Sequence, residues 1–244
     1  MARRDRLTIV AQVADAPPAE AEALLRKHLR KQPRDFVALT ALADVLAPQS
    51  RLGEIGSALA TAAMTPRATV ALIEYACAAA YALNEPEAAL RIATKGTQLH
   101  AESAQIWQQL GKAEIATADA PSAATSLERA HELAPNDTAI LAMLADADLS
   151  KGGFPLPDHY ARLLIDIEPM VASHHVRLGT SQRFNDQLDE AEACFRRAIE
   201  LDPNLPSAYA GLAETLESKG NSEAAATELS PIIETGSASF PRSR

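Results

Sequence analysis

Cysteine is scarce in this sequence. Cys77 and Cys194 are its only cysteines, and they lie far apart along the chain. A disulfide framework needs more cysteines, and a zinc knuckle needs closely spaced pairs, so neither kind of site is expected. We interpret both thiols as small apolar side chains in a core, because free cysteine is commonly buried.

Aromatic residues are also few, at 4% of the chain, whereas alanine and leucine dominate. Strands favour β-branched and aromatic residues, while alanine and leucine are strong helix formers. The composition therefore predicts a helical protein. The length of 244 residues allows one large domain or two small ones.

The chain has no excess of positive charge: its formal net charge is -9. Nucleic acids and anionic membrane surfaces repel an acidic protein, so neither is expected as a partner. Long apolar runs are missing too, and none approaches the roughly 20 residues that cross a bilayer.

The amino-terminal segment has one feature of an export signal. Arg3, Arg4 and Arg6 precede the apolar stretch 7–11, which Gln12 interrupts. An export signal needs an apolar core of about 7–15 residues, which this stretch does not supply. We therefore predict a cytoplasmic protein.

Known catalytic and cofactor motifs are absent. The sequence contains no H-E-x-x-H, no phosphate-binding glycine loop and no G-x-S-x-G. His174 and His175 are adjacent, but neighbours on a helix point about 100° apart and are poorly placed to hold one ion. We predict no catalytic residue, no metal site and no cofactor, and we interpret His175 as a structural residue packed between helices.

The sequence does contain a regular spacing of proline. Pro135, Pro169 and Pro203 are separated by 34 residues each. The same interval divides nearly the whole chain, without insertions, into seven frames: 2–35, 36–69, 70–103, 104–137, 138–171, 172–205 and 206–239.

Residue types recur at fixed places within these frames. The fourth frame carries Trp107, Leu110, Gly111, Ala123, Leu127, Ala130 and Pro135, the sixth His175, Leu178, Gly179, Ala191, Phe195, Ala198 and Pro203, and the seventh Tyr209, Leu212, Ala213, Ala225, Leu229 and Ile232. This pattern resembles the tetratricopeptide repeat, with W-x2-L-G-x2-Y, then A-x3-F, then P. The third and fifth frames match it moderately, and the first and second weakly.

Each part of the pattern has a physical cause. Residues at i, i+3 and i+4 share one stripe of a first helix. Gly111 and Gly179 are expected to be small because a second helix crosses close to them. Asn84 and Gly220 suit the left-handed backbone that often ends a helix. The terminal proline stops the second helix because proline cannot continue it.

Three frames depart from the pattern. The first has an arginine-rich first half and only one good helix. The second has Pro48, which should close its first helix early, and Gly53 and Gly56, which weaken its second, so we expect it to form the loosest hairpin. In the fifth frame, Pro157 predicts a second helix that starts late, with the proline in its first turn.

The resemblance implies an all-α fold, a right-handed α-solenoid of about seven 34-residue helix-turn-helix repeats of which the first is degenerate. We assign 2–35 to a degenerate amino-terminal repeat or cap, 36–239 to the repeat array and 240–244 to a flexible tail. No polar capping helix follows the last repeat. Its exposed end is tolerated, packs against another copy, or continues into a longer protein. Leu229, Ile232 and Ile233 make self-association through this end a reasonable hypothesis.

The resemblance also implies a binding surface, because inward-facing positions of first helices hold peptides or partner helices in this family. Tyrosine, methionine and arginine are enriched in the cores of interfaces and in binding hot spots, which supports a site across the third to sixth frames. The candidate partner-binding residues are Glu74, Tyr75, Tyr81, Gln105, Gln108, Gln109, Lys112, Met143, Asp146, Arg177 and Arg183.

Two functions remain in view. The first is a scaffold that binds a protein or peptide in this groove. The alternative is the amino-terminal recognition module of a larger bacterial transferase, of the sulfotransferase or glycosyltransferase type, whose catalytic domain is absent from this chain.

Overall fold

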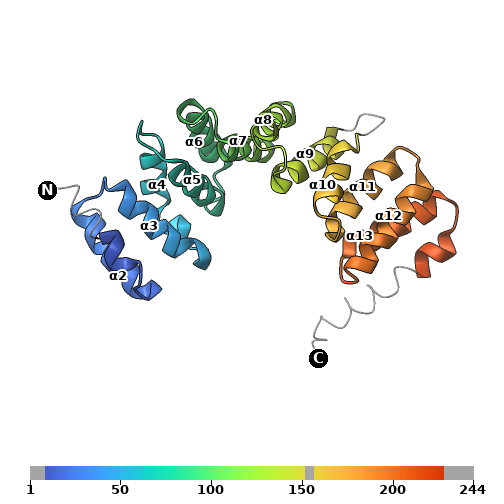
Figure 1. The fold of residues 1–244 in the computed structure, drawn as a ribbon, viewed down its shortest axis with the longest axis horizontal. Helices are drawn as coiled ribbons and strands as arrows, with labels where there is room; N and C mark the ends of the chain where they lie inside the picture. Colours follow the sequence, from blue (N-terminus) through green and yellow to red (C-terminus); the bar gives the residue numbers. More distant parts are fainter. Residues whose placement is uncertain (1–8, 152–156, 228–244) are drawn as a thin grey trace. The chain divides into compact units, whose positions relative to one another are not determined.

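The computed structural model describes residues 9–151 and 157–227, and this part of the chain contains helices and no strand. The elements, shown in Figure 1, are α2 (Pro18–Lys31), α3 (Phe36–Leu46), η1 (Ala47–Gln49), η2 (Leu52–Ile55), α4 (Gly56–Ala63), α5 (Val70–Ala82), α6 (Pro86–Leu99), α7 (Ala104–Ala116), α8 (Ala120–Leu133), α9 (Thr138–Lys151), α10 (His159–Ile167), α11 (Ala172–Phe184), α12 (Leu188–Leu201) and α13 (Pro206–Ser218). The predicted all-α solenoid fold is confirmed.

The first helices of the hairpins keep the 34-residue spacing without exception. They begin at Phe36, Val70, Ala104, Thr138, Ala172 and Pro206. Four second helices keep it as well, because α2, α6, α8 and α12 begin at Pro18, Pro86, Ala120 and Leu188. The chain therefore builds the same supersecondary unit at each step of the repeat.

The chain forms two compact units, residues 1–134 and 135–244. In the first unit, consecutive helices from α2 to α8 pack on one another around a core that includes the fully buried Leu42, Leu72 and Ile106. In the second unit, α9 to α13 pack in the same way, and the fully buried Phe195 and Leu212 belong to its core. Burying one such side chain contributes about 1.5–3 kcal/mol.

The turns within the hairpins share one backbone device. The residue two positions after the first helix is left-handed at Asn84, Ala118, Asp186 and Gly220. The next amide bonds back to the helix, for example from Glu85 N to Ala80 O at 2.9 Å. This bond satisfies a helix-end carbonyl. The predictions for Asn84 and Gly220 are confirmed, whereas Ala118 and Asp186 were not anticipated.

The glycines that recur in the pattern lie where two helices approach closely. A Cβ at Gly111 would lie 2.7 Å from Leu127 Cγ, and one at Gly179 would lie 3.2 Å from the Phe195 ring. The prediction that a crossing second helix requires a small residue at both positions is confirmed.

The second repeat departs from its neighbours as the sequence indicated. α3 ends at Leu46, and Pro48 lies in the short helix η1 that follows. α4 begins at Gly56, after the 3-10 turn η2. Gly53 and Gly56 face Leu83, whose side chain would lie 3.2 Å and 2.8 Å from added Cβ atoms. The two glycines therefore leave room for the Leu83 side chain, and they also shorten the helix. That this hairpin is the loosest of the array stays a prediction.

One detail of the fifth repeat was predicted wrongly. α10 starts late, at His159, but Asp158 occupies the position before it and Pro157 lies outside the helix. The Asp158 carboxylate accepts a hydrogen bond of 2.8 Å from Arg162 Nε, one turn later. An acid beside the first turn is favourable for the helix dipole. The predictions for Leu229, Ile232 and Ile233 and for the tail 240–244 lie outside the described residues.

Candidate protein-binding surface

The candidate binding residues all lie on first helices, but they divide between the two units. The first unit carries seven of them on α5 and α7: Glu74, Tyr75, Tyr81, Gln105, Gln108, Gln109 and Lys112. The second unit carries four on α9 and α11: Met143, Asp146, Arg177 and Arg183. We describe the two sets separately.

On α5, two tyrosines are held differently. The Tyr75 hydroxyl donates to Asp44 Oδ1 of α3 at 2.5 Å, and this hydrogen bond raises the pKa of Tyr75 to about 12. The Tyr81 hydroxyl is buried and has no hydrogen-bond partner among the described residues, and burial raises its pKa. Because this oxygen is shielded from solvent, Tyr81 supports the surface through the packing of its ring.

On α7, three amides and one cation face the same side. Gln105 is exposed, with its Oε1 3.0 Å from the Ser103 hydroxyl that donates to it. Gln108 and Gln109 are half-buried and make no hydrogen bond within the described part of the chain. Lys112 is exposed. Burial raises the pKa of Glu74 on α5, and the positive charge of Lys112 offsets part of that rise.

Because α5 and α7 pack against each other, these side chains form one surface. It offers amide donors and acceptors, a carboxyl group, an ammonium group and tyrosine rings. Such a set can hydrogen-bond an extended backbone and cover its apolar side chains.

In the second unit, both arginines are already paired. Arg177 binds Asp146 of α9 through two bonds, Nε to Oδ1 at 2.7 Å and a terminal nitrogen to Oδ2 at 3.0 Å. Arg183 lies 3.0 Å from Glu214 of α13, and its guanidinium carbon stands 4.5 Å from the centre of the Phe184 ring. A ligand must therefore compete with these ion pairs or use their remaining donors.

Three residues of this surface were missed from the sequence. Glu214 and Asp44 are partners of predicted residues, and Phe184 is an aromatic ring that is 42% exposed. The spacing of the repeats could have indicated such partners. Tyr75 and Asp44 are 31 residues apart, as are Arg177 and Asp146, so the same two repeat positions face each other between neighbouring first helices.

A second recurring contact joins each repeat to the one before it. The indole nitrogen of Trp107 donates to Ala101 O at 2.7 Å, and the Tyr209 hydroxyl donates to Pro203 O at 3.1 Å. His175 Nε2 lies 2.9 Å from Pro169 O. In all three the side chain reaches a carbonyl six residues earlier. His175 is structural as predicted, but only half-buried; His174 is the buried histidine, with Nε2 2.9 Å from Glu168 Oε2.

The comparisons with known proteins agree with this repeated geometry. A family model described as "TPR repeat" matches residues 185–220. Among solved structures, MamA 41-end from Desulfovibrio magneticus RS-1 aligns with a TM-score of 0.65 at 19% identity, over 70% of this chain and 97% of its own. YrrB, described as a TPR protein with an unusual peptide-binding site, aligns with a TM-score of 0.61 at 16% identity, over 75% of this chain and 95% of its own. No curated protein sequence matches the chain.

The chain has the all-α solenoid fold of tetratricopeptide repeat proteins. The 34-residue spacing of its first helices, the close glycine contacts and the match over one repeat all point to this family. The solved structures, at their low identities, support the fold alone.

The described residues include two cysteines and no candidate metal cluster. No group of three or more histidine, cysteine or acidic side chains that could hold a metal occurs in residues 9–151 and 157–227. Cys77 is fully buried and Cys194 half-buried, and desolvation raises the pKa of Cys77 to about 12 and raises that of Cys194 as well. Since the thiolate is the reactive form, both are poor nucleophiles. Among the same residues, no helix is long and apolar enough to cross a membrane.

Proposed function

We propose that this chain is a non-catalytic scaffold of the tetratricopeptide repeat type that binds a peptide or partner protein across the first helices of its repeats. The surface on α5 and α7 supports this best. It combines the unengaged amides of Gln108 and Gln109 with the exposed ammonium group of Lys112. Half-buried polar groups without partners are the groups that gain most when a ligand covers them.

The ligand would lie along both helices in an extended form. The amides would pair with its backbone, because an amide offers a donor and an acceptor at once. Lys112 and Glu74 would fix the direction in which the ligand chain runs, because each would contact a group of opposite charge on the ligand. In the second unit, the Arg177–Asp146 pair and the Phe184 ring form a comparable surface.

Photo-crosslinking tests this proposal directly. A photoreactive amino acid is placed at Gln109 on α7 and, as the matched control, at the exposed Arg91 on α6. We expect a partner adduct from position 109 and none from 91. The adduct should diminish when Tyr81→Ala is added, while circular dichroism shows an unchanged helix content.

The same adduct from both positions, or an adduct indifferent to Tyr81→Ala, would contradict the assignment of this surface. Arg177→Glu tests the second unit in the same way, because it replaces the ion pair with Asp146 by two like charges. The role as recognition module of a larger bacterial transferase, the cytoplasmic location and self-association through the last repeat remain hypotheses.

A further inference from the structure

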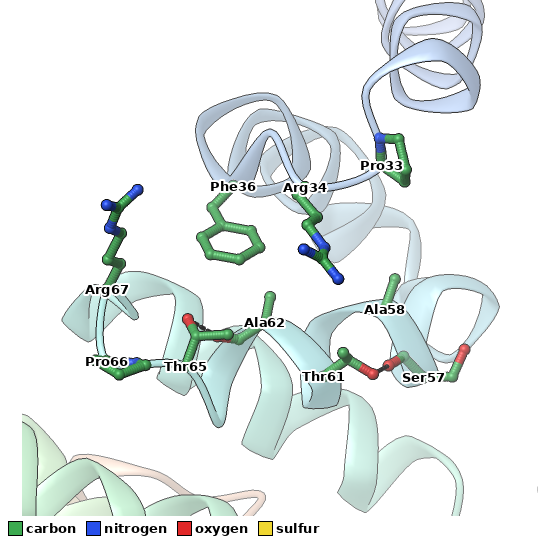
Figure 2. A pocket seen from close by; sticks show the side chains of 10 residues that line it. All are labelled: Pro33, Arg34, Phe36, Ser57, Ala58, Thr61, Ala62, Thr65, Pro66 and Arg67. Carbon is green, nitrogen blue, oxygen red and sulfur yellow. Dashed lines mark hydrogen bonds between the residues drawn. The ribbon is translucent and has the colours of Figure 1, made fainter.

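A separate hollow lies in the first unit, away from α5 and α7. It has a volume of about 840 Å³ and opens between the linker that joins α2 to α3 and the helix α4 with the residues after it. Figure 2 shows the ring of Phe36, the first residue of α3, and the side chain of Arg34 in the linker, both pointing towards α4, with Arg67 at the far end. The hollow is larger than a single side chain needs and lies within the usual size range of ligand pockets.

The second repeat carries smaller residues at two lining positions of the hollow than the next four repeats do. Thr65 stands at the position that Leu99, Leu133, Ile167 and Leu201 occupy in the next four repeats. Thr61 likewise stands at the position of Lys95, Arg129, Leu163 and Arg197. A threonine side chain is one heavy atom smaller than leucine or isoleucine and is shorter than lysine or arginine, so both exchanges leave more room between α4 and the linker.

The lining has an apolar floor. Phe36, Ala62 and Pro66 contribute carbon atoms. The Thr61 and Thr65 hydroxyls donate to the carbonyls of Ser57 and Ala62, at 2.8 Å and 2.7 Å, so they have no proton left for a ligand. An apolar side chain therefore suits the floor better than a polar one.

The rim is cationic. Arg34 and Arg67 are exposed and form no ion pair with any described residue. They also line a second, smaller hollow beside Phe36, and a third hollow that shares Pro33 and Ala58 with the first adds Arg26 and Arg30. No aspartate or glutamate lines any of the three. This charge is unusual in a chain whose net charge is -9.

We propose that this hollow is a second docking site, for an acidic segment of a partner protein. One apolar side chain of that segment enters between Phe36 and Ala62. Carboxylates on either side of it bind Arg34 and Arg67, whose planar guanidinium groups match carboxylates in geometry. The apolar floor distinguishes such a segment from a polyanion, which would use the arginines and leave the floor empty.

The test uses variants that narrow the hollow or reverse its charge. Thr65→Leu restores the residue of the third, fourth and sixth repeats, so it is compatible with the fold. Arg34→Glu and Arg67→Glu reverse the rim. Arg91→Glu, at an exposed position of α6, makes the same charge change elsewhere. Circular dichroism and thermal unfolding of each full-length variant check that the fold is kept.

The probe is a phage-displayed library of random peptides selected on the full chain. We expect the selected pool of peptides to share a leucine, phenylalanine or methionine that is flanked by acidic residues. Recovery of that pool should fall at least ~10-fold on Thr65→Leu and on the rim variants, and should be unchanged on Arg91→Glu.

Two results would overturn the proposal. One is the absence of any pool whose recovery depends on Thr65→Leu. The other is binding of single-stranded DNA or anionic lipid vesicles that the rim variants abolish and Thr65→Leu leaves intact, which would assign the rim to polyanions. Because α5 and α7 are unchanged in these variants, the outcome is independent of the crosslinking at Gln109.

Discussion

At the scale of single residues, Ala118 holds a backbone conformation that few alanines adopt. Its φ is +63°, at the position that Asn84 and Gly220 occupy in other repeats. A left-handed alanine costs about 1 kcal/mol relative to glycine, which has no Cβ to clash. Ala118→Gly should therefore raise the thermal midpoint by roughly 2–4 °C. Ala78→Gly, at an exposed site within α5, is the control and should lower it, since glycine is a poor helix former. A lower midpoint in both variants would contradict the argument.

Among the described glycines, Gly211 has the least room for a side chain. A Cβ there would lie 2.3 Å from Cε1 of Phe195. Gly211→Ala should therefore destabilise the protein by about 1–3 kcal/mol, the usual cost of overpacking a core. Because the clash involves one ring, adding Phe195→Leu should cost less in the Gly211→Ala background than in the wild type. Urea unfolding of the two single variants and the double variant measures this coupling, and strictly additive losses would show that the clash is relieved elsewhere.

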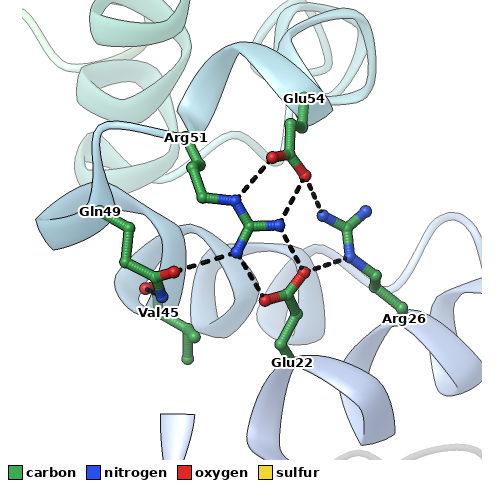
Figure 3. Close-up of polar contacts among 6 residues, drawn as sticks. All are labelled: Glu22, Arg26, Val45, Gln49, Arg51 and Glu54. Atoms are coloured by element: carbon green, nitrogen blue, oxygen red, sulfur yellow. Dashed lines mark hydrogen bonds and ion pairs between the residues drawn. The ribbon is translucent and has the colours of Figure 1, made fainter. Parts of the chain in front are cut away.

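At the scale of elements, the degenerate second repeat is tied to α2 by a network of charges (Figure 3). Arg51, just before η2, binds Glu22 of α2 at 2.9 Å and Glu54 of η2 at 2.6 Å. Arg26 of α2 binds both of the same carboxylates. Networks of this kind hold geometry better than isolated surface pairs. They connect the irregular segment between α3 and α4 to the preceding helix.

This network should make the stability of the second repeat depend on pH. Hydrogen bonds from Arg51 and Arg26 lower the pKa of Glu22, and those from Arg51 lower the pKa of Glu54. A carboxylate whose pKa is lowered by folding stabilises the fold fully above its unfolded value of about 4.5, and this stabilisation is lost as the pH falls through the folded pKa. Arg51→Met should thus be destabilising near neutral pH, and the difference from wild type should shrink below about pH 4.

Hydrogen exchange of amides in η2 and α4, measured at neutral and at acid pH, checks this prediction. Arg91→Met serves as the control, because the exposed Arg91 lies outside the network. A difference between Arg51→Met and wild type that stays constant with pH would mean that the network contributes nothing measurable there.

At the scale of the whole molecule, repeat contacts are nearly all between neighbours. In such proteins stability is a sum of repeat terms and neighbouring interfaces, so damage stays local. Gly211→Ala should therefore speed hydrogen exchange in α11, α12 and α13 and leave the amides of α3 to α6 unchanged. Faster exchange throughout residues 9–134 would show that the two compact units unfold as one.

The sequence alone determined the period, the helical hairpins and their starting residues. These features depend on local chemistry: proline ends a helix wherever it stands, and a stripe of leucine and alanine defines one helix face. It also identified Gly111 and Gly179 as sites of close helix contact, because such contacts recur with the 34-residue repeat. On the same grounds it placed the candidate binding residues on first helices, although their role in binding stays a prediction.

Only the tertiary structure decided which of those residues are engaged. That Arg177 is bound to Asp146, and Tyr75 to Asp44, depends on how far one hairpin is shifted against the next. The hollow beside Phe36 likewise depends on tertiary packing. A threonine in the sequence does not show whether neighbouring side chains occupy the volume that a larger residue would take. Contacts between hairpins are set by packing across the stack, and that information is not carried by any single stretch of the chain.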